Sequence, residues 1–320
     1  CEQLGVTPVR GLVPREVVRV ITPGTVVEES ILPARANNYL ASLVPSSDGV
    51  GLALVDGSTG DFFATEIRDS GWEAQLVAEL ERTRPAECLL PRSRAEDPSL
   101  KASIPQGTYL TPTEDALTSS VAAERLLREH FGVSTLDGFG LDSAPLAARA
   151  AGGLIAYLRE TQPSALAELE SLHLYSLDRY MKLDAAARRH LELTAGASTG
   201  SVEGSLLGVL DRTRTPMGGR LLRRWIGQPL LEVAAIEARL DAVEEMVKSP
   251  LGRAELGEAM ATVADLERLS SRASQQTLTP RDCQAMARSL GAVPRMLRVL
   301  ERWLPGVLAT EAGQLDPCSE

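Results

Sequence analysis

The sequence has few of the residues that build metal centres and disulfide frameworks. Its 320 residues include 4 cysteines and 3 histidines. The cysteines lie far apart without a CxxC pair, and the histidines stand singly, whereas zinc sites and disulfide frameworks need such residues in clusters. We therefore expect no metal site and reduced thiols. Cys88 lies in an apolar run and is expected to be buried and inert, and His173 and His190 are expected to be surface residues.

Long apolar runs and an excess of positive charge are also missing. No run of eighteen apolar residues occurs, so the sequence predicts no membrane-spanning helix. The chain begins at Cys1 without a visible secretory signal, and we expect a cytoplasmic location. The net charge is -10, and most of the excess acid lies in residues 1–162. This charge disfavours the first half as a binder of phosphate backbones, because cations dominate that affinity.

The sequence also lacks the loop that binds nucleotide phosphates in many ATPases. That loop, GxxxxGK[ST], uses its amides and its lysine to hold the phosphates, and this chain contains no Gly-Lys pair. We expect no cofactor-binding residues and no residue that performs covalent chemistry. The chain is therefore not expected to be an enzyme.

Residues 163–320 carry apolar residues at helical spacing. Thr215-Pro216 predicts the start of a helix, since Thr caps and Pro suits the first helical position, and Gln228-Pro229 predicts its end. The expected packing seam comprises Leu206, Leu210, Leu221, Trp225, Leu230, Ile236 and Leu240. Further helices are expected at 164–172, 184–193, 251–260, 265–274 and 280–303, the last bent or broken at Pro294.

Residues 17–162 read instead as strands followed by helices, which is typical of an α/β sheet domain. A turn at 56–60 joins two of the strands as a hairpin. Ser143 is expected to cap the last helix, and Gly152-Gly153 indicates close packing. The expected strands are 17–21, 51–55, 61–67, 88–90 and 108–110, and the expected helices are 71–84, 114–130 and 143–162.

Several motifs in order resemble the MutS family of DNA mismatch repair proteins. They are CEQL at 1–4, REVVR at 15–19, TPGT at 22–25, NNYL at 37–40, VDGSTG at 55–60, YMKLD at 180–184 and RRHLEL at 188–193, together with the stretch 205–246. The family commonly has Asn where this chain has His190. The resemblance implies the end of a mismatch-binding domain and a linker at 1–16. It further implies an RNase H-like connector domain at 17–162 and an incomplete helical core, or lever, domain at 163–320.

The resemblance also implies a function for the longer protein. Members of the family are dimeric, ATP- and Mg-dependent clamps that bind mismatched double-stranded DNA and recruit MutL. The family reads mismatches with a Phe-Xaa-Glu wedge, and no Phe of this chain has Glu two residues on. We therefore expect an internal fragment that serves as a scaffold and allosteric relay between DNA-binding and ATPase domains, and as a docking module for MutL.

Two alternatives stay open at this point. Asp56, Asp61 and Glu66 could hold Mg²⁺ for an RNase H-like nuclease, although Asp-Gly-Ser-Thr-Gly is also ordinary turn chemistry. The chain could also be a free-standing helical adaptor. The basic cluster could contact phosphate, but the favoured interpretation is a solvated helix face that pairs with Asp211 and with acids of neighbouring helices. The cluster consists of Arg212, Arg214, Arg220, Arg223 and Arg224.

Overall fold

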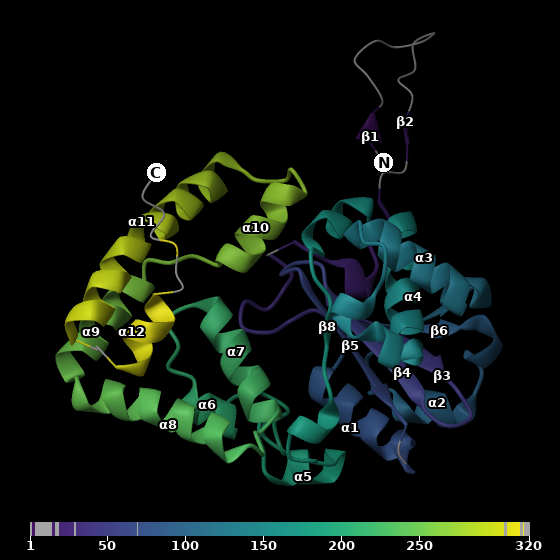
Figure 1. The fold of residues 1–320 in the computed structure, drawn as a ribbon, viewed down its shortest axis with the longest axis horizontal. Coiled ribbons are helices and arrows are strands. Elements are labelled where there is room, and N and C mark those ends of the chain that lie inside the picture. The colour runs from purple at the N-terminus through teal and green to yellow at the C-terminus, as the bar shows by residue number, and fades with distance from the viewer. Residues whose placement is uncertain are drawn as a thin grey trace. The chain divides into compact units, whose positions relative to one another are not determined.

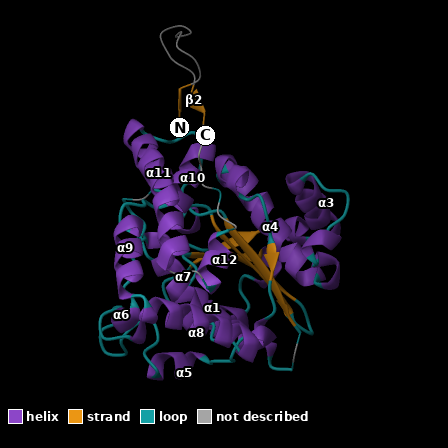
Figure 2. Cartoon of the chain, turned by 60° about the vertical axis from the view of Figure 1, so that its left-hand side comes forward, coloured by secondary structure: helices purple, strands orange, loops and turns teal. Residues whose placement is uncertain are grey.

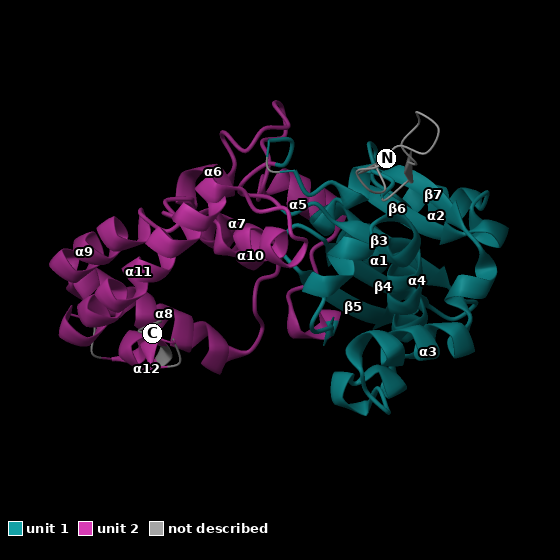
Figure 3. Cartoon of the chain, turned by 90° about the horizontal axis from the view of Figure 1, so that it is seen from above, with its two compact units in different colours: residues 1–32, 37–176 teal, residues 33–36, 177–320 magenta. Residues whose placement is uncertain are grey.

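The structure is a computed structural model that divides into two compact units (Figure 3). The sheet unit contains residues 1–32 and 37–176, and the helical unit contains residues 33–36 and 177–320. The described residues are 2–3, 15–16, 19–28, 30–68, 70–303, 306–313 and 316. The limits expected from the sequence, 17–162 and 163–320, are a different division and stay predictions.

A mixed six-stranded sheet forms the centre of the sheet unit (Figure 1). The strands are β3 (Leu40–Pro45), β4 (Val50–Asp56), β5 (Asp61–Ile67), β6 (Glu87–Pro91), β7 (Tyr109–Thr113) and β8 (His173–Leu174). Their order across the sheet is β7-β6-β3-β4-β5-β8. The pairs β3–β4 and β4–β5 are antiparallel, whereas β3–β6, β6–β7 and β5–β8 are parallel. The hairpin expected at 56–60 is confirmed, and Asp56 and Asp61 are register partners across it.

Helices cover both faces of this sheet (Figure 2). On one face, α4 (Pro145–Thr161) contacts β3, β4 and β5. On the other side lies α1 (Trp72–Thr83), in which Leu76 and Leu80 are fully buried. The close packing predicted at Gly152 is confirmed: a Cβ added there would lie 2.4 Å from the Cβ of Ala123 in α3 (Ser120–Phe131). Helix α2 (Pro98–Ser103) completes the α-helices of this unit's described residues.

Several elements of the sheet unit differ from those predicted from the sequence. The central strand β3 was not predicted, although it is buried along nearly its whole length. The strand expected at 17–21 is wrong for residues 19–21, which lie outside any strand, and residues 17–18 lie outside the described residues. Ser143 does not cap α4, because its N-cap is Ala144 and the Ser143 hydroxyl donates instead to the Gly140 carbonyl. Residues 163–168 form a 3₁₀-helix rather than an α-helix.

The helical unit contains eight α-helices among its described residues. They are α5 (Ala185–His190), α6 (Leu206–Leu210), α7 (Pro216–Gly227), α8 (Val233–Lys248), α9 (Pro250–Met260), α10 (Leu266–Ser274), α11 (Pro280–Trp303) and α12 (Val307–Ala312). The predicted start of α7 is confirmed, since the Thr215 hydroxyl accepts a hydrogen bond from Gly218 N at 3.1 Å and Pro216 opens the helix. Helix α11 continues through Pro294, so the expected break is wrong.

A small apolar cluster joins α9, α11 and α12. Leu256, Val299, Leu300 and Ala312 are buried in it. Gly252 lets α9 approach α11, because a Cβ there would lie 2.5 Å from the Cβ of Trp303. None of the helices among the described residues combines the length and the apolar character needed to cross a membrane.

Candidate functional site

The hairpin carboxylates proposed as metal ligands are engaged by protein donors. Asp56 is fully buried, and its Oδ1 accepts from the amide and the hydroxyl of Ser58 at 2.9 and 2.7 Å. Its Oδ2 accepts from Asn37 Nδ2 at 2.9 Å and from the Asn38 amide at 3.0 Å. Asn37 Nδ2 also donates to Asp61 at 3.0 Å. This is the bonding pattern of a turn-stabilising aspartate rather than of an exposed metal ligand.

Glu66 performs a separate structural role. Its Oε2 accepts from the amides of Leu146 and Ala147 at 2.6 and 3.2 Å, which places a carboxylate at the N-terminus of α4, where the helix dipole favours negative charge. Its Oε1 accepts from Arg68. Glu66 lies five positions after Asp61 along β5, about 17 Å at the usual rise of a strand. The three acids therefore do not converge, and the described residues contain no group of acids, histidines or cysteines suited to a metal ion.

Two further buried acids of the sheet unit are hydrogen-bonded to protein groups. Glu87 accepts from Tyr157 Oη at 2.7 Å, from the Thr111 hydroxyl at 2.6 Å and from the Gly24 amide at 3.0 Å. Burial, together with the neighbouring Glu87 carboxylate, raises the pKa of Tyr157 to about 12. Glu79 pairs with Arg82 at 2.5 Å and accepts from Tyr175 Oη at 2.6 Å. The hydrogen bonds of Glu87 and Glu79 thus connect segments of the sheet unit that are far apart in the sequence.

The basic cluster at 212–224 contains a buried arginine of α7, which the sequence pattern does not predict. Arg220 has a side chain only 4% exposed, and it forms two hydrogen bonds of 2.7 Å with Asp265, the N-cap residue of α10. It also pairs with Glu267 at 2.6 Å. These carboxylates raise the pKa of Arg220 above its usual value even though burial opposes this. For Arg220, pairing with acids of a neighbouring helix is confirmed and a solvated position is wrong. The Asp211 carboxylate pairs with Arg35, which lies outside the cluster.

The expected packing seam is exposed rather than buried. Trp225 is 41% exposed and Leu240 is 60% exposed, so neither is a core anchor of the described chain. Helix α8 buries none of its residues, although five apolar side chains follow each other along it at spacings of three and four. These five residues, called the α8 stripe below, are Val233, Ile236, Leu240, Val243 and Val247. Of the other expected seam residues, Leu206, Leu210 and Leu221 are exposed and Leu230 is partly buried.

Such a stripe is typical of a helix that packs against a partner. Next to it, the guanidinium carbon of Arg239 lies 3.7 Å from the ring centroid of Trp225, a cation–π contact that partly covers the indole. The exposed surface is thus apolar along α8 and continues onto the Trp225 side of α7.

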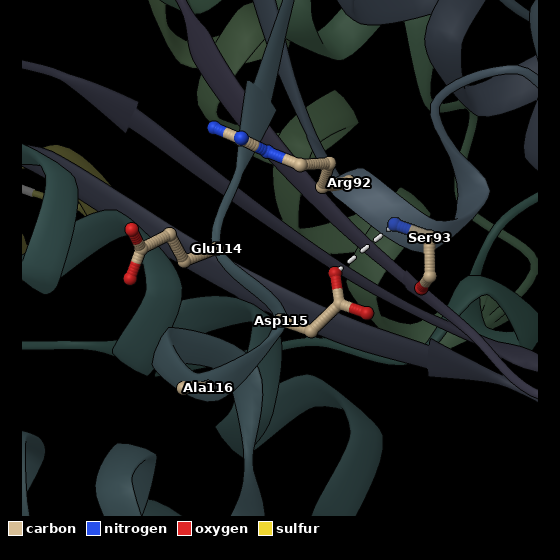
Figure 4. Close-up of a pocket in the computed structure, with 5 residues that line it drawn as sticks. All are labelled: Arg92, Ser93, Glu114, Asp115 and Ala116. Atoms are coloured by element: carbon tan, nitrogen blue, oxygen red, sulfur yellow. Dashed lines mark hydrogen bonds between the residues drawn. The ribbon is translucent and has the colours of Figure 1, made fainter.

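An open pocket of about 420 Å³ lies beside the ends of β6 and β7 (Figure 4). Its lining is Arg92, Ser93, Glu114, Asp115 and Ala116. Asp115 accepts a hydrogen bond from the Ser93 amide at 3.1 Å, and its bonds to Ser93 lower its pKa. Ligands of α/β sheets bind at this edge, but their pockets are mainly apolar. All five lining residues are exposed, so this is an open surface hollow that gives no evidence of a bound ligand.

The single histidines and Cys88 lie where they were expected. His173 and His190 are exposed, and His173 Nε2 lies 3.3 Å from the Ser171 hydroxyl. Cys88 is buried, and burial raises the pKa of its thiol to about 12, which keeps it protonated and unreactive at neutral pH.

Comparison with known families shows which family the chain belongs to. Residues 38–171 match the sequence model of MutS domain II, and residues 186–307 match that of MutS domain III. The chain belongs to the MutS family. The matches follow the two units in order: domain II falls in the sheet unit and domain III in the helical unit.

Relatives support the same assignment along the whole sequence. The chain is 41% identical over 327 residues to DNA mismatch repair protein MutS of Dehalococcoides mccartyi (strain 195), covering 100% of this chain and 36% of that protein. It is 42% identical over 321 residues to the MutS protein of Symbiobacterium thermophilum, covering 99% of this chain and 36% of the relative. It is also 42% identical over 325 residues to the MutS protein of Thermosynechococcus vestitus, covering 97% of this chain and 36% of the relative. The chain thus spans about a third of the length of the MutS proteins that it matches.

Proposed function

We propose that this chain is the connector and lever part of a mismatch repair protein, and that it relays movement between parts that bind DNA and parts that bind ATP. The observation that carries the proposal is the match to MutS domains II and III in this order. The relatives that it matches are DNA mismatch repair proteins about three times as long. A part that lies between other domains can act by changing their arrangement, without chemistry of its own.

Two buried groups of the helical unit support a mechanical role: the apolar cluster of α9, α11 and α12, and the ion pair between α7 and α10. Close-packed helices transmit a displacement instead of absorbing it, because packed interiors are not continuously deformable. Helices α7 and α10 are joined by the buried Arg220–Asp265 pair. The α8 stripe is an apolar surface on which another segment can push.

The finer fold of the sheet unit belongs to this proposal too. The antiparallel meander β3-β4-β5 with β6 and β7 added in parallel beside β3 supports the expected RNase H-like connector fold. A fold does not confer the chemistry of its relatives. The engaged oxygens of Asp56 favour a scaffold over a nuclease.

The partners and the energy source are proposed for the longer protein. Mismatched double-stranded DNA, MutL, a second copy of the protein, and ATP with Mg²⁺ are its proposed partners and cofactors, in the cytoplasm. This chain itself is proposed to hydrolyse no ATP, since its sequence holds no Gly-Lys pair for a phosphate loop.

Three measurements on the purified 320-residue chain test the proposal. We expect no ATP turnover, equal affinity for a G·T duplex and its matched homoduplex, and retention on immobilised MutL. ATP turnover by the chain, or preference for the mismatch, would overturn the relay role. Mg²⁺-dependent cleavage of DNA or of an RNA–DNA hybrid that Asp56→Asn abolishes would instead establish the nuclease alternative.

A further inference from the structure

Four residues near the start of the sequence belong to the helical unit. Residues 33–36, called the strap below, fall in that unit, whereas the chain on both sides of them falls in the sheet unit. The strap is a tight turn in which the Ala36 amide donates to the Pro33 carbonyl at 3.4 Å. Its sequence is Pro-Ala-Arg-Ala, and only one of these side chains is polar.

Two buried arginines bind the main chain of the strap. Arg268 of α10 is 2% exposed, and its Nη2 donates to the carbonyls of Pro33 and Ala36 at 3.0 and 3.1 Å, the two ends of the turn. Arg220 of α7 donates through Nη1 to the carbonyl between them, that of Ala34, at 2.9 Å. Both arginines also face Asp265, which holds their charge in place. The strap therefore satisfies donors of two helices at once.

The side chain of the strap is bound as well. Arg35 forms an ion pair of 2.6 Å with Asp211 and donates to the hydroxyl and the carbonyl of Thr213 at 3.1 and 3.0 Å. Its stem lies against Gly219 of α7, where an added Cβ would lie 2.9 Å from the Arg35 Cγ. Because Gly219 has no side chain, the stem of Arg35 can lie directly against α7.

The strap is followed directly by a residue of the sheet unit. Asn37, the next residue, belongs to the sheet unit and is held there by its bonds to Asp56 and Asp61.

We propose that α7 and α10 form a capture site for a peptide turn, that the strap is its occupant, and that the strap acts as a releasable latch. When seated, it holds α7 and α10 in one arrangement. When released, it leaves three donors of buried arginines without their carbonyl partners and frees the two helices to shift. The latch would serve the relay role proposed above, but it stands on these contacts alone and its test needs neither nucleotide nor DNA.

Trypsin cleavage after Arg35 in the full chain measures the latch. Proteases bind their substrates as extended peptides, so the strap must leave its site first, and the cleavage rate follows the released fraction when reseating is fast. We expect slow cleavage in the native chain. Asp211→Asn removes the ion pair but keeps an oxygen for Thr213, and we expect cleavage about two- to fivefold faster. Arg268→Met removes both carbonyl bonds of α10, and we expect an increase of at least about tenfold.

Glu258→Gln provides the matched control, because it removes another ion pair of the same unit, with Arg295 at 3.5 Å, far along the sequence from the strap. It should leave the rate unchanged. The cut is identified by the mass of the fragment that ends at Arg35. Rapid cleavage of the native chain at Arg35, or equal rates in Asp211→Asn and Glu258→Gln, would overturn the latch. If Arg268→Met fails to fold, Asp211→Asn decides alone, because its ion pair lies at the surface edge of the site.

Discussion

The buried pair between α7 and α10 leads to a quantitative prediction for the stability of the helical unit. Arg220→Met would leave the Asp265 carboxylate, 7% exposed, with only the Nε of Arg268 at 3.9 Å as a cation. Removing one partner of such a pair costs about 3–5 kcal/mol, because a charge is left buried without compensation. Asp265→Asn keeps the N-cap of α10, since Asn caps as well as Asp, but takes away the charge opposite Arg220. We expect it to cost about 2–3 kcal/mol, the value of hydrogen bonds to a charged group.

The double variant Arg220→Met/Asp265→Asn isolates the interaction energy of the pair from the other effects of each substitution. In the double variant neither Arg220 nor Asp265 leaves the other as a buried charge, so the double variant should be more stable than the sum of the single effects by about 2 kcal/mol. The bond of Arg220 to the Ala34 carbonyl is lost in both Arg220→Met backgrounds and cancels in the cycle. Glu267→Gln is the control, because that side chain is half exposed and its loss should cost less than about 1 kcal/mol.

Urea unfolding followed by tryptophan fluorescence measures these values. Trp225 and Trp303 lie in the helical unit and Trp72 in the sheet unit, so a Trp72→Phe background reports the helical unit alone. A coupling below about 0.5 kcal/mol, the usual error of additivity, would refute the reasoning that the pair is a buried unit.

Three other perturbations have defined outcomes. Gly51→Ala should destabilise the sheet unit by about 3 kcal/mol in thermal unfolding, because its Cβ would lie 2.0 Å from the Leu146 carbonyl oxygen, whereas Gly138→Ala, with open space around it, should have little effect. Burial alone would raise the pKa of Asp211, but hydrogen bonds from Thr213 and Arg35 lower the pKa below its usual value. The ionised carboxylate should therefore stabilise the fold above the unfolded pKa of about 3.9, and this stabilisation should be lost as the pH falls through the lower folded pKa. In Asp211→Asn the urea midpoint should depend less on pH over that window. Because the α8 stripe exposes five apolar side chains, we expect the chain to self-associate at high concentration. Leu240→Glu, in the middle of the stripe, should lower the molar mass measured by light scattering, and an unchanged molar mass would contradict association through the stripe.

Turns and helix starts could be predicted from the sequence because the residues that cause them are close together in the chain. The hairpin at 56–60 follows from turn residues between two apolar runs, and the start of α7 follows from Thr215-Pro216. Strand β3 was missed because it is buried on both faces, and such strands lack the alternation that marks a strand.

Long-range features were not readable for a different reason. Asp265, whose carboxylate pairs with the buried Arg220, comes 45 residues later in the sequence, and no local pattern links the two residues. Periodicity identified the apolar face of α8 correctly, but periodicity says nothing about whether the partner of that face lies within the same chain. The expectation that no residue of this chain performs catalysis stays a prediction.

The strap also has a consequence for the order of events on the ribosome. The carbonyl of Pro33 and the guanidinium of Arg268 that binds it are 235 residues apart in the sequence. At translation rates of about 5–20 residues per second, the turn is synthesised roughly 12–47 s before its binding partner emerges. The sheet unit can therefore begin to form early, but the strap must stay accessible until α10 has been synthesised.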